Sequence, residues 1–268
     1  EPETITINGI KTWDDANNQD GKRPANITVN LMDGETTIDS RKVVPGSDGV
    51  WSYSFENLPK YRKGAVGVEI AYTVEEAPVE YYTADYDGYN IKNKHTPEVI
   101  TIGGTKTWDD NSNQDGIRPT SIDVSLYADG TAVSGKTATL SSSNSWTYTF
   151  TGLPVKSNGT TITYSVAETS DVTGYDASVN GFTITNTHTP ATTDISVEKV
   201  WNDANNQDGL RPTNITVKLL ADGTAVSGKT VTLNSANSWK YKFTDLPVYS
   251  NGTKITYTVE ETSTPTGY

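Results

Sequence analysis

Three polar side chains recur at positions that the hydrophobic alternation of the sequence assigns to a buried face. Residues two apart on a β-strand point to the same side, so the apolar residues mark the inward face. A lysine shares that face with Ile7 and Trp13. A glutamate shares it with Tyr72 and Val74, and an asparagine shares it with Ile91. By residue type, the recurring positions are Lys11, Lys106 and Lys199; Glu76, Glu168 and Glu261; and Asn93 and Asn186.

An amine, a carboxyl group and a carboxamide in one apolar site form a reactive set. A lone charge is costly there, and the usual outcome is a shifted pKa that neutralises the group. A neutral lysine amine can attack the side-chain carbon of asparagine while the carboxyl group hydrogen-bonds the carbonyl oxygen and transfers protons. Ammonia leaves and an isopeptide bond remains. The alternative is a buried lysine–glutamate ion pair beside a hydrogen-bonded asparagine, and these residues alone favour neither.

The strands that must position these residues belong to a threefold repeat with a period of about 94 residues. A Lys-x-Trp-x-Asp run, followed by an Asn/Gln-rich turn, Asp-Gly and Arg-Pro, occurs three times; the residue between Trp and the final Asp is Asp in the first two copies and Asn in the third. A Trp-x-Tyr-x-Phe run with Leu-Pro after it also occurs three times, with the same period. One complete β-sandwich fits this period. We therefore predict three modules, at 1–97, 98–190 and 191–268, joined at the His-Thr-Pro segments that begin at His95 and His188.

Within each repeat the pattern is that of half-buried strands. Apolar and polar residues alternate, and Asp-Gly or Asn-Gly pairs mark turns between the runs. We expect about seven short antiparallel strands in a complete module, hence an all-β fold of tandem sandwiches.

Composition excludes several classes of function. The net charge of −12 would repel nucleic acid and anionic lipid, so we expect neither as a partner. There is no cysteine, so no disulfide can staple these small domains. No apolar run approaches the roughly 20 residues that cross a bilayer. We expect no membrane insertion in this segment, with any export or anchoring signals outside it.

Several motifs together resemble the Cna B-type (CnaB) repeats of Gram-positive surface adhesins and pilins. They are the Lys-x-Trp-x-Asp run with Asn-Gln-Asp-Gly-x-Arg-Pro, the Tyr-x-Val-x-Glu strand, the Gly-Tyr after it, and the closing Asn-x-His-Thr-Pro. The resemblance implies a reverse immunoglobulin-like sandwich whose first and last strands are joined by an autocatalytic Lys-Asn isopeptide bond, assisted by a buried glutamate. Carried over by position, the bonds are Lys11-Asn93 with Glu76 and Lys106-Asn186 with Glu168.

The third repeat departs from this pattern. It has Lys199 and Glu261, but the sequence stops at Tyr268, before the position at which the other repeats have their asparagine. We therefore expect a sandwich without its last strand, in which Lys199 stays unreacted and Glu261 is an unpaired copy of the catalytic glutamate.

Three other groups of residues are candidate sites: an acidic loop, the two histidines and a tyrosine-rich stretch. The Asp14–Gly21 loop is rich in Asp and Asn but lacks the spaced acidic ligands of an EF-hand, so a hydrogen-bonded turn paired with Arg23 is the favoured interpretation. His95 and His188 lie in linkers without a ligand cluster nearby in the sequence. We expect no metal site and no cofactor. Tyr81, Tyr82 and Tyr86 lie in a stretch that diverges from the other repeats, and a ligand contact there is a further hypothesis.

These features favour a structural function. We expect a stalk or spacer segment of an extracellular, cell-wall-anchored adhesin, with isopeptide bonds that resist force and proteolysis. It needs no partner to fold, and it is covalently continuous with further domains, one of which could bind a host matrix ligand. The alternatives are a repeat region that itself binds such a ligand, or part of a sortase-assembled pilin. We expect no enzyme beyond single-turnover bond formation.

Overall fold

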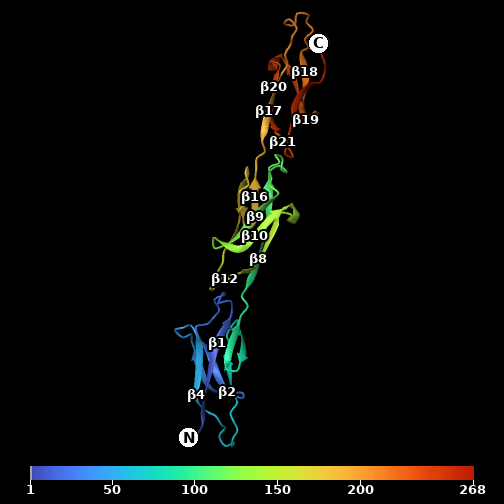
Figure 1. Ribbon diagram of the computed structural model, residues 1–268. Coiled ribbons are helices and arrows are strands. Elements are labelled where there is room, and N and C mark those ends of the chain that lie inside the picture. The colour runs from blue at the N-terminus through green and yellow to red at the C-terminus, as the bar shows by residue number, and fades with distance from the viewer. Residues whose placement is uncertain (1) are drawn as a thin grey trace. The chain divides into compact units, whose positions relative to one another are not determined.

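The regular secondary structure of the chain consists almost entirely of strands. The computed structural model describes residues 2–268 (Figure 1), and its helical elements there are two 3-10 turns, η1 (Ser142–Asn144) and η2 (Ser235–Asn237). No helix in this part of the chain is long and apolar enough to span a membrane. Thr, Val, Ile and aromatic residues fill the strands, in keeping with their preference for pleated, half-buried surfaces. The all-β prediction is confirmed.

Two compact units divide the chain. Unit 1 contains the chain up to Ile102, which includes the first repeat, together with Ala128–Thr131 and Thr149–Tyr164. Unit 2 contains Gly103–Tyr127, Ala132–Tyr148 and Ser165–Tyr268. The division passes through the second repeat. It does not coincide with the sequence period, so the module limits at residues 97 and 190 stay a prediction.

Repeat 1 forms two sheets around one core. The strand orders are β4-β1-β7-β6 and β3-β2-β5. Buried and exposed residues alternate along β1, β4, β5 and β7, as expected for sheets with one face to the core and one to solvent. Phe55, Leu31 and Ile91 lie at the centre of the core. The strands are β1 Thr4–Asp14, β2 Ile27–Asp33, β3 Thr36–Val43, β4 Trp51–Pro59, β5 Tyr72–Glu76, β6 Thr83–Asp87 and β7 Asn90–Lys94.

The first and last strands of repeat 1 run parallel. Lys11 lies opposite Ile91, and Trp13 lies opposite Asn93. The expectation of strands that are all antiparallel is therefore wrong at this pair. Alternation reports only which face of a strand is buried, and it looks the same beside a parallel or an antiparallel neighbour. The direction is set by how the chain returns to the sheet, which periodicity does not record.

A glycine in the first strand makes room for a tyrosine that reaches the last strand. The hydroxyl of Tyr53 donates a hydrogen bond to the backbone carbonyl of Tyr89. A Cβ on Gly9 would lie only 2.4 Å from the Tyr53 ring. Burial raises the pKa of Tyr53 to about 12, so its hydroxyl remains a donor. Gly104 and Tyr148 repeat the arrangement in repeat 2.

Repeat 2 has the same two sheets and an added hairpin. The sheet orders are β11-β8-β16-β15 and β10-β9-β14, and β12 pairs with β13. The first and last strands, β8 and β16, again run parallel, with Trp108 opposite Asn186. The strands are β8 Val99–Asp109, β9 Ser121–Ala128, β10 Thr131–Ser141, β11 Thr147–Pro154, β12 Lys156–Ser157, β13 Thr160–Thr161, β14 Tyr164–Glu168, β15 Asp176–Asn180 and β16 Thr183–Thr187.

Repeat 3 lacks a counterpart of β7 and β16 within the described residues. Its sheets are β17-β20 and β19-β18-β23, with the hairpin β21-β22. Tyr241 and Val259 are 44% and 42% exposed, whereas the equivalent Tyr53 and Val74 are both 8% exposed. The core of repeat 3 is therefore open on this side. The strands are β17 Thr192–Glu198, β18 Asn214–Ala221, β19 Thr224–Asn234, β20 Lys240–Pro247, β21 Tyr249–Ser250, β22 Thr253–Lys254 and β23 Tyr257–Glu261.

An arginine–aspartate pair closes the turn after each first strand. Arg118 donates to both carboxylate oxygens of Asp110, at 2.9 and 2.5 Å. Burial raises the pKa of Asp110, but the hydrogen bonds from Arg118, from the Asn113 amide and from Tyr175 outweigh it and hold the pKa at about 2. Asp15 with Arg23 and Asp203 with Arg211 form the same pair. The predicted pairing of Arg23 is confirmed, and the equivalent arginines of repeats 2 and 3 pair in the same way.

Each linker histidine lies between two hydrogen-bond acceptors. Nε2 of His188 is 3.0 Å from Oδ2 of Asp115, and Nδ1 is 2.8 Å from the Gly174 carbonyl. His95 has the same environment, with Asp20 and the Tyr81 carbonyl. Because an ionised carboxylate and a carbonyl can only accept, the doubly protonated ring satisfies both contacts. The sequence did not reveal these partners, since the aspartates lie more than 70 residues away.

We expect the titration of His188 to report this contact. The hydrogen bond to Asp115 raises its pKa, against a smaller opposing effect of burial. A folded pKa above the unfolded value gives stability that is complete below the unfolded pKa, about 6.5, and lost as the pH rises through the folded pKa. Histidine NMR should give a His188 midpoint above 6.5, and Asp115→Asn should lower it. A midpoint below 6.5 in the unchanged chain would contradict this.

Candidate functional site

The lysine, glutamate and asparagine of repeat 1 come from both sheets. Lys11 on β1 and Asn93 on β7 are on adjacent strands of one sheet, whereas Glu76 is the last residue of β5 in the other. The side chains of Lys11 and Glu76 are 0% and 2% exposed, and Asn93 is fully buried. The structure therefore turns all three inward, as the alternation predicts.

The strand register puts the lysine and the asparagine on one face. Asn93 lies opposite Trp13, two residues along β1 from Lys11. Residues two apart share a face, and paired residues on neighbouring strands point the same way. The two side chains are thus diagonal neighbours in the core, with Glu76 facing them from the opposite sheet.

Burial weakens the basicity of the lysine. It lowers the pKa of Lys11, although the nearby Glu76 carboxylate acts in the opposite direction. Nζ lies 3.1 Å from Oε1 of Glu76 and 4.4 Å from the centre of the Trp13 ring. A lower pKa increases the fraction of neutral amine, which is the nucleophilic form.

The polar atoms of this site are poorly satisfied. Among the described residues, Nζ of Lys11, Oε1 of Glu76 and both Nδ2 and Oδ1 of Asn93 are buried without a hydrogen-bond partner. The 3.1 Å contact of Lys11 with Glu76 is within ion-pair distance but lacks hydrogen-bond geometry. Each unpaired buried polar atom costs about 1–3 kcal/mol. A bond between Lys11 and Asn93 would remove Nδ2 and replace a buried ammonium group with an amide N–H.

Repeat 2 holds the same set in a closer arrangement. Nζ of Lys106 lies 3.1 Å from Oε2 of Glu168, and Nδ2 of Asn186 donates to Oε1 of the same carboxylate at 3.1 Å. Burial lowers the pKa of Lys106, against the opposing effect of Glu168. The carboxylate thus contacts both the amine and the amide nitrogen. This is where a group that moves a proton from one to the other must lie.

Repeat 3 shows the lysine and the glutamate without the asparagine. Nζ of Lys199 donates to Oε2 of Glu261 at 2.8 Å, and the two side chains are 22% and 25% exposed. Lys199 lies just beyond β17, which ends at Glu198, whereas sequence alternation places it within the first strand. The difference follows from the missing neighbour strand, which extends the pairing of β1 and β8 in the other repeats. Here the pair is a partly solvated salt bridge.

The arrangement in repeats 1 and 2 can support amide transfer. Neutral Nζ of Lys11 would attack Cγ of Asn93, while a proton on Glu76 neutralises the carbonyl oxygen. The intermediate then collapses: the Cγ–Nδ2 bond breaks, Nδ2 leaves as ammonia with a proton that Glu76 relays from Nζ, and the oxygen returns its proton to Glu76 as the carbonyl re-forms. One C–N bond forms and one breaks, so the step needs no oxidant, reductant or further reactant.

A metal-binding interpretation of the acidic loop finds no support in the contacts. Asp15 pairs with Arg23, and Asp20 accepts from His95 and from the Glu98 amide. The described residues contain no group of three or more His, Cys, Asp or Glu side chains that could hold a metal ion. The loop is thus a hydrogen-bonded turn.

The tyrosine stretch of repeat 1 is mainly structural. Tyr82 packs edge to face on Trp13, with ring centres 4.9 Å apart, and donates to Asp15 at 2.8 Å. Tyr175 and Tyr268 occupy the same place in the other repeats. The view that this stretch diverges is therefore wrong for Tyr82. The signal that could have found it is the aromatic residue that ends each Gly-Tyr or Tyr-Tyr pair.

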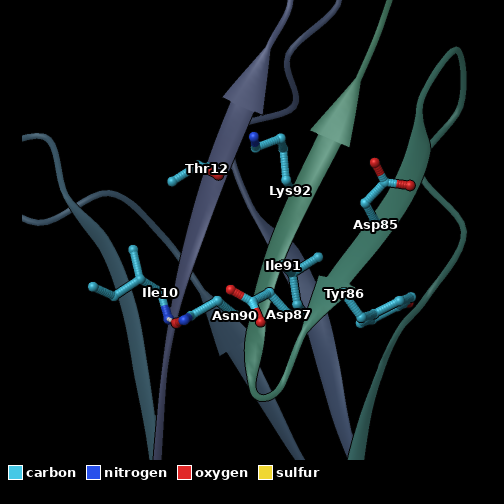
Figure 2. A pocket seen from close by; sticks show the side chains of 8 residues that line it. All are labelled: Ile10, Thr12, Asp85, Tyr86, Asp87, Asn90, Ile91 and Lys92. Carbon is cyan, nitrogen blue, oxygen red and sulfur yellow. Dashed lines mark hydrogen bonds between the residues drawn. The ribbon is translucent and has the colours of Figure 1, made fainter.

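The outer face of the β1–β7 pair carries a groove of about 380 Å³. Figure 2 shows that β1 contributes Ile10 to it, and that the hairpin of β6 and β7 contributes Tyr86 and Asn90 among others. Oδ1 of Asn90 accepts from the Ile10 amide at 3.0 Å, and the Tyr86 hydroxyl accepts from the Glu76 amide at 3.0 Å. The first contact joins the neighbouring strands β1 and β7, and the second joins β6 to β5 of the other sheet.

Known proteins share the sequence pattern and the fold of this chain. The family model of the Cna protein B-type domain matches residues 7–94, 102–187 and 195–268. A collagen adhesin of Staphylococcus aureus is 50% identical over 97% of this chain, which spans 22% of that protein.

Two solved structures of the collagen-binding protein of S. aureus are also similar. The structure of two B repeat units is 47% identical, with a TM-score of 0.59, over 98% of this chain and 69% of that one. A single B repeat unit is 46% identical over 70% of this chain and all of that one, with a TM-score of 0.34. The family model covers all three repeats, including the shorter third, and the immunoglobulin-like sandwiches seen here match the fold of the two-repeat structure. The chain therefore belongs to the Cna protein B-type domain family.

Proposed function

We propose that this chain is a structural stalk segment of a Gram-positive cell-surface adhesin, in which Lys11-Asn93 and Lys106-Asn186 isopeptide bonds keep repeats 1 and 2 closed. The observation that carries the proposal is the buried lysine, glutamate and asparagine set, with its unpaired polar atoms, in both complete repeats. The similarity to a collagen adhesin supports the surface role.

The mechanical role follows from which strands the bond would join. The chain enters repeat 1 through β1 and leaves it through β7. A pulling force therefore acts first on these two neighbouring strands. A covalent bond between them carries the load and leaves the rest of the sandwich unloaded. Repeats without cysteine gain in this way the kind of staple that disulfides give other small extracellular domains.

Ligand binding and cell-wall anchoring would belong to other parts of the protein. Since the chain spans about a fifth of the collagen adhesin that it matches, a separate domain would bind the host matrix ligand. Anchoring to the cell wall would likewise depend on other parts of the protein. Each glutamate would act once, on a neighbour that is consumed, so the chain would not be an enzyme with turnover.

A direct role in ligand binding is the second candidate. The groove in Figure 2, with its exposed Ile10 and Tyr86, is the observation that favours it. Micromolar or tighter binding of the chain to collagen or another matrix protein, lost in Tyr86→Ala, would establish this role. A sortase-assembled pilin, the third alternative, would require a linkage lysine that becomes covalently attached to another subunit.

The glutamate variants test bond formation repeat by repeat. In Glu168→Gln, the carboxyl group that contacts both Lys106 and Asn186 can no longer transfer protons. The denatured variant should therefore fall short of its own sequence mass by one ammonia, about 17 Da, instead of the two expected for the unchanged chain, because the bond in repeat 2 fails to form. The matched control is Glu261→Gln in repeat 3, which should recover no ammonia. Retention of the full deficit in Glu168→Gln would refute the assigned role.

A further inference from the structure

A backbone contact joins the Asp-Gly turn of repeat 1 to a hairpin of repeat 2. The tip of the β12–β13 hairpin is Asn158-Gly159, and the Gly159 amide donates to the Gln19 carbonyl at 3.0 Å. A Cβ on Gly21 would lie 2.6 Å from Cα of Gly159, so the two glycines meet without side chains. All of these residues belong to unit 1.

The same contact recurs inside unit 2. The Gly252 amide, at the tip of the β21–β22 hairpin, donates to the Gln114 carbonyl at 3.0 Å. A Cβ on Gly116 would lie 2.3 Å from Cα of Gly252. In a two-residue turn, the amide of the second turn residue has no partner within the hairpin. These glycine amides are thus bonded only because another repeat supplies the acceptor.

An aspartate in the same turn holds the linker. The Asp20 side chain is 7% exposed, and its Oδ2 accepts from the Glu98 amide at 3.1 Å and faces Nε2 of His95 at 2.9 Å. Asp115 holds the Ala191 amide at 2.9 Å in the same way. The Gln-Asp-Gly turns of repeats 1 and 2 therefore contact the hairpin through their glutamine and glycine and the linker through their aspartate.

We propose that the Gln-Asp-Gly turn is a docking surface for the Asn-Gly hairpin of another repeat of this type, and that this joint fixes the orientation of successive repeats. On the turn side the backbones approach too closely for a Cβ, and on the hairpin side Gly159 and Gly252 have φ of +79° and +76°, which favours glycine. The third copy of the surface, at Gln207–Gly209, is open: a Cβ on Gly209 meets nothing within 4 Å. It fits the hairpin of a further repeat. The joint is independent of the proposed isopeptide bonds.

Amide hydrogen exchange in the full chain tests the docking. The Gly252 amide should exchange slowly, and Gly116→Ala should accelerate its exchange at least tenfold, because the added Cβ separates the two backbones. Gly209→Ala is the matched control: Gly116 and Gly209 both have φ of +70°, so the backbone strain is the same, but Gly209 has no neighbour to displace. Fast exchange of Gly252 in the unchanged chain, or equal acceleration by both substitutions, would overturn the proposal.

Orientation can be measured separately. Residual dipolar couplings, fitted for each repeat by itself, should give alignment tensors of equal magnitude for repeats 1 and 2 in the unchanged chain and of unequal magnitude in Gly21→Ala. Unequal magnitudes in the unchanged chain would show that the repeats reorient independently, which contradicts a fixed joint.

Discussion

When a chain carrying Asn93→Ala is pulled from its ends, repeat 1 should unfold with a step of roughly 250–300 Å. The unchanged chain should show no such step for repeat 1 or repeat 2. The reason is that a Lys11-Asn93 bond closes a loop of about 80 residues, and an extended residue spans about 3.5 Å. Without the asparagine the loop can open, and its full length is released. Single-molecule force spectroscopy measures these steps directly.

This experiment has two controls, one within the same chain and one in a separate variant. Repeat 3 has no asparagine partner for Lys199, so its extension should appear in every trace. Lys92→Ala changes the neighbour of Asn93 on β7 whose side chain points outward, and it should leave repeat 1 locked. Full-length steps from repeats 1 and 2 in the unchanged chain would mean that no covalent bond carries the load.

Asn186→Ala should lower the unfolding free energy of repeat 2 by about 4–5 kcal/mol, if a Lys106-Asn186 bond constrains the unfolded chain as a disulfide closing a similar loop does. For a domain of this size, that corresponds to a fall in Tm of roughly 20 °C or more. Calorimetry should show one transition moving down while the others stay. Protease resistance of repeat 2 should fall in parallel.

This substitution leaves the Lys106–Glu168 pair in place, as in repeat 3, so the effect isolates the bond rather than an unpaired buried charge. Thr185→Ala, on the same strand but outside the buried set, is the control and should change Tm by only a few degrees. A shift for Asn186→Ala no larger than that of the control would show that the asparagine contributes only ordinary packing.

Much of the fold could be predicted because repetition and alternation are strong signals. The inward placement of Lys11, Glu76 and Asn93 follows from parity alone, since one face of each strand must be apolar. The direction of β7 relative to β1 could not be predicted. A strand shows the same alternation whichever way its neighbour runs, and the direction depends on the path of the chain between the sheets.

The candidate site was predictable in composition but not in its contacts. The sequence does not show that Asn186 contacts Glu168 while Asn93 has no hydrogen-bond partner, because side-chain placement depends on packing around each strand. The histidine–aspartate contacts were missed for a different reason. Asp20 and His95 are far apart in the chain, and only the close approach of the turn and the linker makes them partners.

The intact mass of the denatured chain tests the central claim most directly. Each Lys-Asn bond expels one ammonia, so the account predicts a mass lower than that of the sequence by two ammonias, about 34 Da, with none lost from repeat 3. Peptide mapping should place the crosslinks at Lys11-Asn93 and Lys106-Asn186. A mass equal to that of the sequence would contradict the account and leave the buried lysine, glutamate and asparagine as an unreacted polar network.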